Sequence, residues 1–79
     1  MRIIDQDGCD YPYESIIISH CDGIIYARPV SNMDKRYFLA KYSTQEKAEK
    51  AMQMLHNCYQ GALPNTIFRF PQDDEISVD

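Results

Sequence analysis

The chain lacks the patterns that mark membrane-spanning, secreted and metal-bound proteins. Its apolar runs, such as Ile16-Ile17-Ile18, are at most four residues long, far short of the roughly 20 residues that a membrane-spanning helix needs. The opening segment Met1–Asp5 already contains an acidic residue, and no apolar signal-peptide core follows it. The cysteines, Cys9, Cys21 and Cys58, are odd in number and fall in no CxxC or HxxxH context. We therefore expect a cytosolic protein with no disulfide framework, no metal and no cofactor.

Catalytic motifs are also missing. The sequence contains no GxSxG, no phosphate-cradling Walker loop and no pair of carboxylates in an apolar frame. His20 and His56 are the candidate general bases, and isolated histidines in a strand or late in a helix are more often structural. We therefore expect no catalytic residue, and a binding protein rather than an enzyme.

Positive charge is scarce outside the middle of the chain. The net charge is −4, with one base and five acids in residues 1–27, six bases and three acids in residues 28–50, and one base and four acids in residues 51–79. Long nucleic acid needs a broad basic footprint, which is absent. The basic middle suits a small anion, although a solvated hairpin and helix face also explains it and is the commoner case.

The remaining signals predict a single α+β domain over residues 1–71. Asp22-Gly23 predicts a tight hairpin turn, and Ser43–Glu46 matches a capping box that predicts a helix from Thr44 to about Tyr59. Gly61 ends that helix. We expect strands over residues 1–5, 15–19, 24–30, 35–42 and 66–71. The expected fold is an antiparallel sheet of four or five strands with one α-helix packed on a face, followed by a solvated acidic tail over residues 72–79.

The small size of the domain favours self-association. A chain of 79 residues buries only about 60–65% of its unfolded surface, so its core is marginal. One helix covers only part of one sheet face and leaves tyrosine and phenylalanine side chains on the other face uncovered. We therefore expect a homo-oligomer.

Two arginines are candidate anion ligands. Arg69 follows Phe68 in the last strand, and alternation places these two side chains on opposite faces. Arg28 precedes Pro29 at a strand end. A guanidinium offers a planar fork that matches phosphate oxygens. The alternatives are a solvated Arg69, and an Arg28 that pairs with an aspartate, either Asp22 or Asp34.

Aromatic side chains supply the second half of a nucleotide site. Four of them are suited to stack a base: Tyr26, Tyr37, Phe38 and Tyr42. The alternative is that they are simply good strand formers. Composition alone does not choose between the two explanations.

Several short motifs carry a family resemblance. They are the opening Met1–Gly8, the pair Pro12-Tyr13, the helix entry Ala40–Ala48, the run Met52–Leu55 and the close Phe68–Glu75. With these motifs the chain resembles small prophage-encoded proteins of Gram-positive bacteria, and among them the Thoeris anti-defence sponges. These phage proteins sequester cyclic nucleotide immune signals without cleaving them.

The resemblance implies a site and an assembly. The sponges are hexamers built from dimers, and they hold cyclic oligonucleotides with two arginines at the positions of Arg28 and Arg69. We add Tyr26 and Phe68 to the predicted ligand-binding set. Longer members of the family carry an extra segment between the helix and the last strand, and that segment contributes to a cyclic ADP-ribose pocket. In this chain only Gly61–Asn65 connects the helix to the last strand. The resemblance therefore implies sequestration of cyclic oligonucleotides, rather than cyclic ADP-ribose, in the host bacterial cytoplasm.

Two other functions fit the same sequence. A small acidic inhibitor that binds a protein, such as an anti-CRISPR, would use the acids at both ends of the chain. A structural or regulatory phage protein would bind no ligand at all. The basic middle of the chain favours the sponge over the acidic inhibitor.

Overall fold

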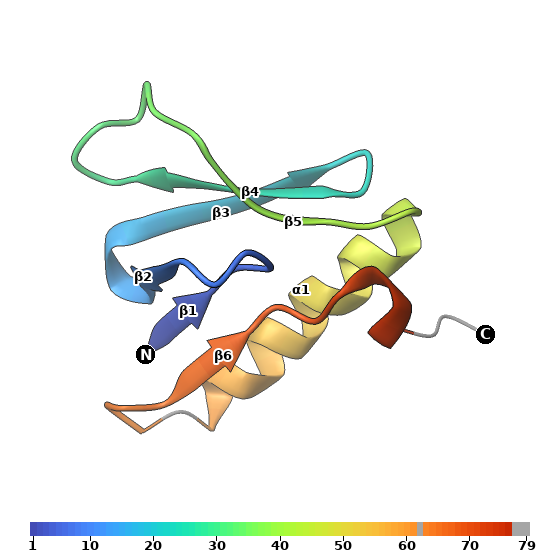
Figure 1. Ribbon diagram of the computed structural model, residues 1–79. Helices are drawn as coiled ribbons and strands as arrows, with labels where there is room; N and C mark the ends of the chain where they lie inside the picture. Colours follow the sequence, from blue (N-terminus) through green and yellow to red (C-terminus); the bar gives the residue numbers. More distant parts are fainter. Residues whose placement is uncertain (62, 77–79) are drawn as a thin grey trace.

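Two three-stranded sheets and one long helix enclose a common core (Figure 1). The computed structural model describes residues 1–61 and 63–76. The elements are β1 (Arg2–Ile4), β2 (Asp10–Pro12), η1 (Tyr13–Ser15), β3 (Ile16–Cys21), β4 (Ile24–Pro29), β5 (Tyr37–Lys41), α1 (Gln45–Gln60), β6 (Ile67–Arg69) and η2 (Asp73–Glu75). The α+β class is confirmed.

The expected single sheet of four or five strands is replaced by two smaller ones. One sheet has the order β3-β4-β5 and is antiparallel throughout. The other has the order β2-β1-β6, in which β1 is antiparallel to β2 and parallel to β6. The closing strand β6 therefore returns from the helix to the first strand, not to the hairpin.

The Asp22-Gly23 turn between β3 and β4 is confirmed. Both residues have positive φ, 52° and 82°, as the two-residue turns of right-twisted hairpins require. A Cβ atom on Gly23 would lie 2.7 Å from the carbonyl oxygen of Tyr42. The Tyr42 amide also donates to the Gly23 carbonyl at 2.8 Å, so the turn is held against the chain that leaves β5.

A buried carboxylate organises the loop between β1 and β2. Asp5 is only 4% exposed, and it accepts hydrogen bonds from the amides of Asp7 and Cys9 and from the Tyr11 hydroxyl. Burial, together with the hydrogen bond and charge of Asp5, raises the pKa of Tyr11 to about 12. The donors that surround Asp5 satisfy a charge that burial would otherwise disfavour.

The next residue, Gln6, joins the two sheets. Its amide donates to the Leu39 carbonyl at 3.0 Å, and its side-chain oxygen accepts from the Lys41 amide at 2.8 Å. Its side-chain nitrogen donates to the Pro71 carbonyl at 2.9 Å. Gln6 thus covers the free edge of β5 and ties it to the chain that follows β6.

The helix is present as predicted, but its cap is displaced by one residue. Thr44 is the N-cap, and its hydroxyl accepts from the Lys47 amide. The predicted cap, Ser43, instead donates from its amide and hydroxyl to Asp73. On the helix, Ala48, Ala51 and Leu55 are buried, whereas Met52 is partly exposed and Tyr59 is exposed.

The segment after β6 packs against the domain instead of forming a solvated tail. Ile76 is 6% exposed, and Gln72 donates from its side chain to the Gln6 carbonyl. Hydrogen bonds from the Ser43 amide and hydroxyl, with the Lys47 ammonium nearby, hold the pKa of Asp73 below its usual value. The expected tail thus docks over residues 72–76, and residues 77–79 lie outside the described part of the chain.

Replacement of Gly23 by alanine should destabilise the protein by about 1–3 kcal/mol, since a side chain there meets both an unfavourable φ and the Tyr42 carbonyl. Thermal or urea unfolding measures this cost. Gly61→Ala is the matched control, because Gly61 has φ of −104° and nothing near its Cβ position. Equal stability of the two variants would contradict this account of the turn.

Docking of the Asp73 carboxylate should make stability depend on pH. Its pKa is lowered on folding, so its contribution is present above the unfolded value of 3.8 and is lost as pH falls through the lower folded value. Asp73→Asn should therefore be less stable than the parent at neutral pH, and the gap should close in acid. Asp74→Asn, which removes the same charge from an exposed position, should keep the parent's pH profile; an identical profile for all three proteins would refute the docking.

Candidate functional site

One face of the β3-β4-β5 sheet points away from the core. Alternation on β4 buries Ile25 and Ala27 and turns the side chains between and after them outward. The pairing register places Phe38 of β5 opposite Tyr26 and Ile17 of β3 opposite Arg28. We call Ile17, Tyr26, Arg28, Phe38 and the neighbouring Arg36 the outer sheet face.

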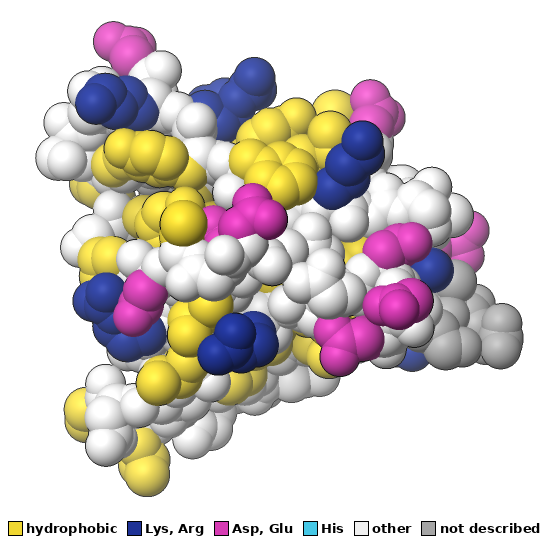
Figure 2. All heavy atoms as spheres, in the orientation of Figure 1, with side chains coloured by type: hydrophobic (Ala, Val, Ile, Leu, Met, Phe, Trp, Pro, Cys, Tyr) yellow, Lys and Arg dark blue, Asp and Glu magenta, His cyan; other side chains and the backbone are white. Residues whose placement is uncertain are grey.

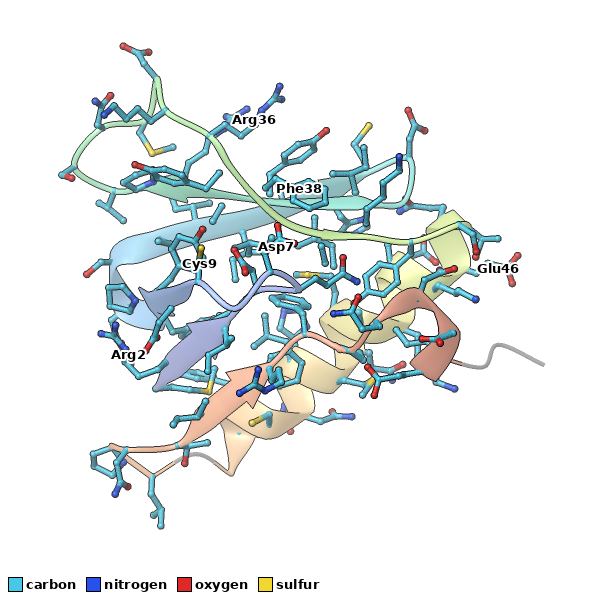
Figure 3. The ribbon with its side chains drawn as sticks, in the orientation of Figure 1. Arg2, Asp7, Cys9, Arg36, Phe38 and Glu46 are labelled. Carbon is cyan, nitrogen blue, oxygen red and sulfur yellow. The ribbon has the colours of Figure 1, made fainter. Side chains whose placement is uncertain are left out.

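A β-bulge positions the aromatic pair of this face. The register between β4 and β5 shifts at Ile25/Tyr26, which leaves Leu39 as an extra residue on β5. Leu39 and Ala40 are consequently both buried, while Phe38 before them is 42% exposed. Figure 3 shows Phe38 and Arg36 on the side of the sheet away from α1, and in Figure 2 hydrophobic side chains gather over this sheet with lysine or arginine beside them.

The two arginines of the outer sheet face have different partners. The guanidinium carbon of Arg36 lies 4.4 Å from the centre of the Tyr26 ring, a cation–π contact that holds a positive charge over an aromatic face. The Arg28 side chain is exposed, and within residues 1–61 and 63–76 its guanidinium has no hydrogen bond or ion pair. Neither Asp22 nor Asp34 pairs with it, so its donors are available to an anion.

The other two predicted site residues lie elsewhere. Phe68 is 8% exposed and packs edge-on against Phe70 at 5.1 Å between ring centres, so it belongs to the core and presents no stacking surface. Arg69 is exposed on β6, opposite Ile4 of β1, in the other sheet from Arg28. One copy of the chain therefore assembles Tyr26 with Arg28 but does not bring Arg69 or Phe68 to them.

The remaining candidate stacking residues are structural. Tyr37 points to the inner side, where its ring lies 5.9 Å from that of Tyr11. Tyr42 is buried, its hydroxyl donates to the Pro71 carbonyl at 2.8 Å, and burial raises its pKa to about 12. Of the four predicted aromatics, Tyr26 and Phe38 thus remain on the outer sheet face.

Two hollows flank Glu14 on a different side of the domain. One, of about 310 Å³, lies between β3 and α1 and is lined by Tyr13, Glu14, Ile16, Ile18, Met52, Leu55 and His56. The other, of about 440 Å³, is lined by Met1, Glu14, Tyr59, Gln60, Leu63 and Pro64. Glu14 is bound to the amino group of Met1 at 2.8 Å, which lowers its pKa. Among the described residues that line the two hollows there is no lysine or arginine, so these hollows are poorly suited to phosphate.

The histidines show no catalytic arrangement in the described residues. The Nδ1 atom of His20 lies 2.7 Å from the side-chain nitrogen of Gln45, whose oxygen accepts from the Gly23 amide. His56 lines the smaller hollow, whose other lining residues are Glu14, Tyr13 and the apolar side chains of β3 and α1. In residues 1–61 and 63–76, no three side chains of His, Cys, Asp or Glu are grouped as a metal ion would require, and no helix there has the length and apolarity to cross a membrane.

Comparison with known proteins gives no further guide, since no family model, curated protein or solved structure matches this chain.

Sequence reasoning missed two members of the outer sheet face, Arg36 and Ile17. Arg36 is one of the six basic residues counted in residues 28–50. Its position over Tyr26 depends on the bulge at Leu39, and no sequence pattern predicted that bulge. Ile17 faces outward because β3 alternates from the Asp22-Gly23 turn. That turn was predicted, so the register it sets was the signal that could have found Ile17.

The exposed and the buried residues of the predicted site should differ in how much they contribute to the free energy of unfolding. Arg28→Ala should change the free energy of unfolding by no more than about 0.5 kcal/mol, because it removes an exposed and unpaired side chain. Phe68→Ala should cost about 3–5 kcal/mol, since it empties a core position. Urea unfolding compares the two, and a small loss for Phe68→Ala would mean that this ring lies outside the core.

Proposed function

We propose that this protein is a phage anti-defence protein that binds and sequesters cyclic nucleotide signals in the host cytoplasm without cleaving them. The observation that carries the proposal is the unpaired, exposed Arg28 beside the Tyr26–Phe38 pair on an uncovered sheet face. The resemblance to the Thoeris sponges supports the same class of ligand.

The outer sheet face has the two chemistries that a nucleotide needs. An exposed aromatic ring stacks a base, a contact worth about 1–3 kcal/mol. A free guanidinium pairs with phosphate oxygens in a bidentate manner. Arg36, held at 4.4 Å over Tyr26, adds positive charge at the aromatic pair without a change in the fold.

A cyclic oligonucleotide fits this face better than cyclic ADP-ribose does. Leu63 and Thr66 hydrogen-bond to each other through the Leu63 amide and the Thr66 hydroxyl, and through the Thr66 amide and the Leu63 carbonyl. Residues 63–66 thus form a tight turn, and a connection as short as Gly61–Asn65 is too short for a nucleotide-enclosing lid. Among the described residues that line the hollow beside it, the charged groups are the Glu14 carboxylate and the Met1 ammonium, which pair with each other at 2.8 Å. This leaves no free cation there for a pyrophosphate.

Assembly brings in the second arginine under this proposal. Arg28 and Arg69 lie in different sheets of one chain, so a site that uses both requires two copies. A homo-oligomer, up to the hexamer of the sponges, would surround one cyclic phosphate ring with several guanidinium groups. Absence of catalytic groups from the outer sheet face is consistent with sequestration rather than hydrolysis.

Substitution of Arg28 should weaken ligand binding. In isothermal titration calorimetry against a panel of cyclic dinucleotides and trinucleotides, the parent should bind at least one member. Arg28→Ala should bind that member at least about tenfold more weakly, because a charge-assisted phosphate contact contributes about 1.5–3 kcal/mol, and Tyr26→Ala should show a similar loss. The double variant Arg28→Ala with Arg69→Ala should not bind.

The matched control is Arg2→Ala, since Arg2 is already paired with Asp10 on the other sheet and should keep the parent's affinity. Chromatography of the ligand after denaturation of the complex should return it intact. A parent that binds none of the panel would overturn the sponge proposal and favour the acidic inhibitor, and a cleaved product would make the protein an enzyme.

A further inference from the structure

The outer border of β3 is an uncovered sheet edge. In the order β3-β4-β5, β3 pairs with β4 on one side only. The hairpin register and the hydrogen bond from the Val30 amide to the Ser15 carbonyl turn the peptide groups of Ile17, Ser19 and Cys21 toward β4. Those of Ile18 and His20 therefore point to the open side, and no backbone partner for them exists in residues 1–61 and 63–76.

The other sheet edges are short or covered. The edge of β5 is occupied by Gln6, through the Leu39 carbonyl and the Lys41 amide. β2 and β6 each have three residues. Each also contains a residue that disfavours pairing with another strand, a proline in β2 and an arginine in β6. β3 has six residues, Ile16–Cys21, with no lysine, arginine, aspartate, glutamate or proline. Natural proteins protect long edges with such residues, so an edge that lacks them is a template for another strand.

We propose that two copies of this chain join through the edge of β3, antiparallel, about a two-fold axis at Ile18. An unpaired row of amides and carbonyls is complementary only to another extended strand. With Ile18 opposite Ile18 of the second copy, these two residues exchange both hydrogen bonds, and each His20 amide donates to the Ile16 carbonyl of the other copy. The result is one continuous six-stranded sheet.

This pairing also covers apolar surface that the single chain leaves open. Ile16 and Ile18 are only partly buried, and they line the 310 Å³ hollow with Met52 and Leu55. In the dimer, the two Ile18 side chains meet on the inner sheet face, beside the 310 Å³ hollow of each copy. The apolar cross-strand contact adds to the backbone hydrogen bonds. The interface does not use Tyr26 or Arg28, so it stands independently of the proposed ligand.

Charge placed at Ile18 tests the interface. In size-exclusion chromatography with light scattering, Ile18→Lys should halve the mass of the parent assembly, because like charges would face each other across the axis. Ile18→Glu should behave in the same way, and an equimolar mixture of the two variants should recover the parent mass. Ile17→Lys is the control, since its side chain lies on the outer face opposite Ser19 of the second copy, and its mass should equal that of the parent.

Hydrogen exchange of the parent gives a readout that does not depend on a folded variant. The Ile18 and His20 amides should be protected in concentrated protein and should lose that protection on dilution, whereas the Ile17 and Ser19 amides, which face β4, should stay protected. A monomeric parent, an unchanged mass for Ile18→Lys, or fast exchange of the Ile18 amide at every concentration would each overturn the proposal.

Discussion

The loop Asp5–Cys9 is the constraint on which the two-sheet architecture depends. Asp5 is buried with three donors around it, which fixes the path of the chain from β1 into β2. Because the loop is fixed, Gln6 reaches both the open edge of β5 and the Pro71 carbonyl. The Gln6 side-chain amide makes the hydrogen bonds that a neighbouring strand would otherwise make. This one residue therefore covers the edge of β5 and anchors the chain after β6. The same contact lies next to the outer sheet face, since Phe38 immediately precedes Leu39, whose carbonyl accepts a hydrogen bond from the Gln6 amide.

Local signals in the sequence predicted the local elements well. The Asp22-Gly23 turn, the helix over residues 45–60 and the return of a strand near Phe68 all depend on neighbours in the chain, and all three were predicted. The division into two sheets was not, because it depends on side-chain contacts between Gln6 and residues more than thirty positions away. The displaced helix cap has a similar cause: Asp73 takes the Ser43 hydroxyl that a purely local capping box would have used.

In the candidate site, too, the local features could be predicted from the sequence and the long-range ones could not. Tyr26 and Arg28 share a face because residues two apart in a strand always do, and this was within reach of the sequence. Phe68 and Arg69 were expected to join them, but β6 pairs with β1 in the other sheet. Alternation in β6 correctly separated the two side chains, and burial then made Phe68 a core residue. Sequence pattern thus gives the facing of each side chain within its strand, while the partner strand decides which side chains become neighbours.

The parallel pairing of β1 with β6 links the first strand to the last through contacts about 65 positions apart, among them Ile3 opposite Phe68. Local hairpins and helices form early, whereas such distant contacts must overcome the entropy of closing a long loop. A growing chain on the ribosome therefore has no partner for one side of β1 until residues 67–69 have emerged. The hairpin and the helix can form during synthesis, but the native order of strands is completed only after the closing strand leaves the exit tunnel.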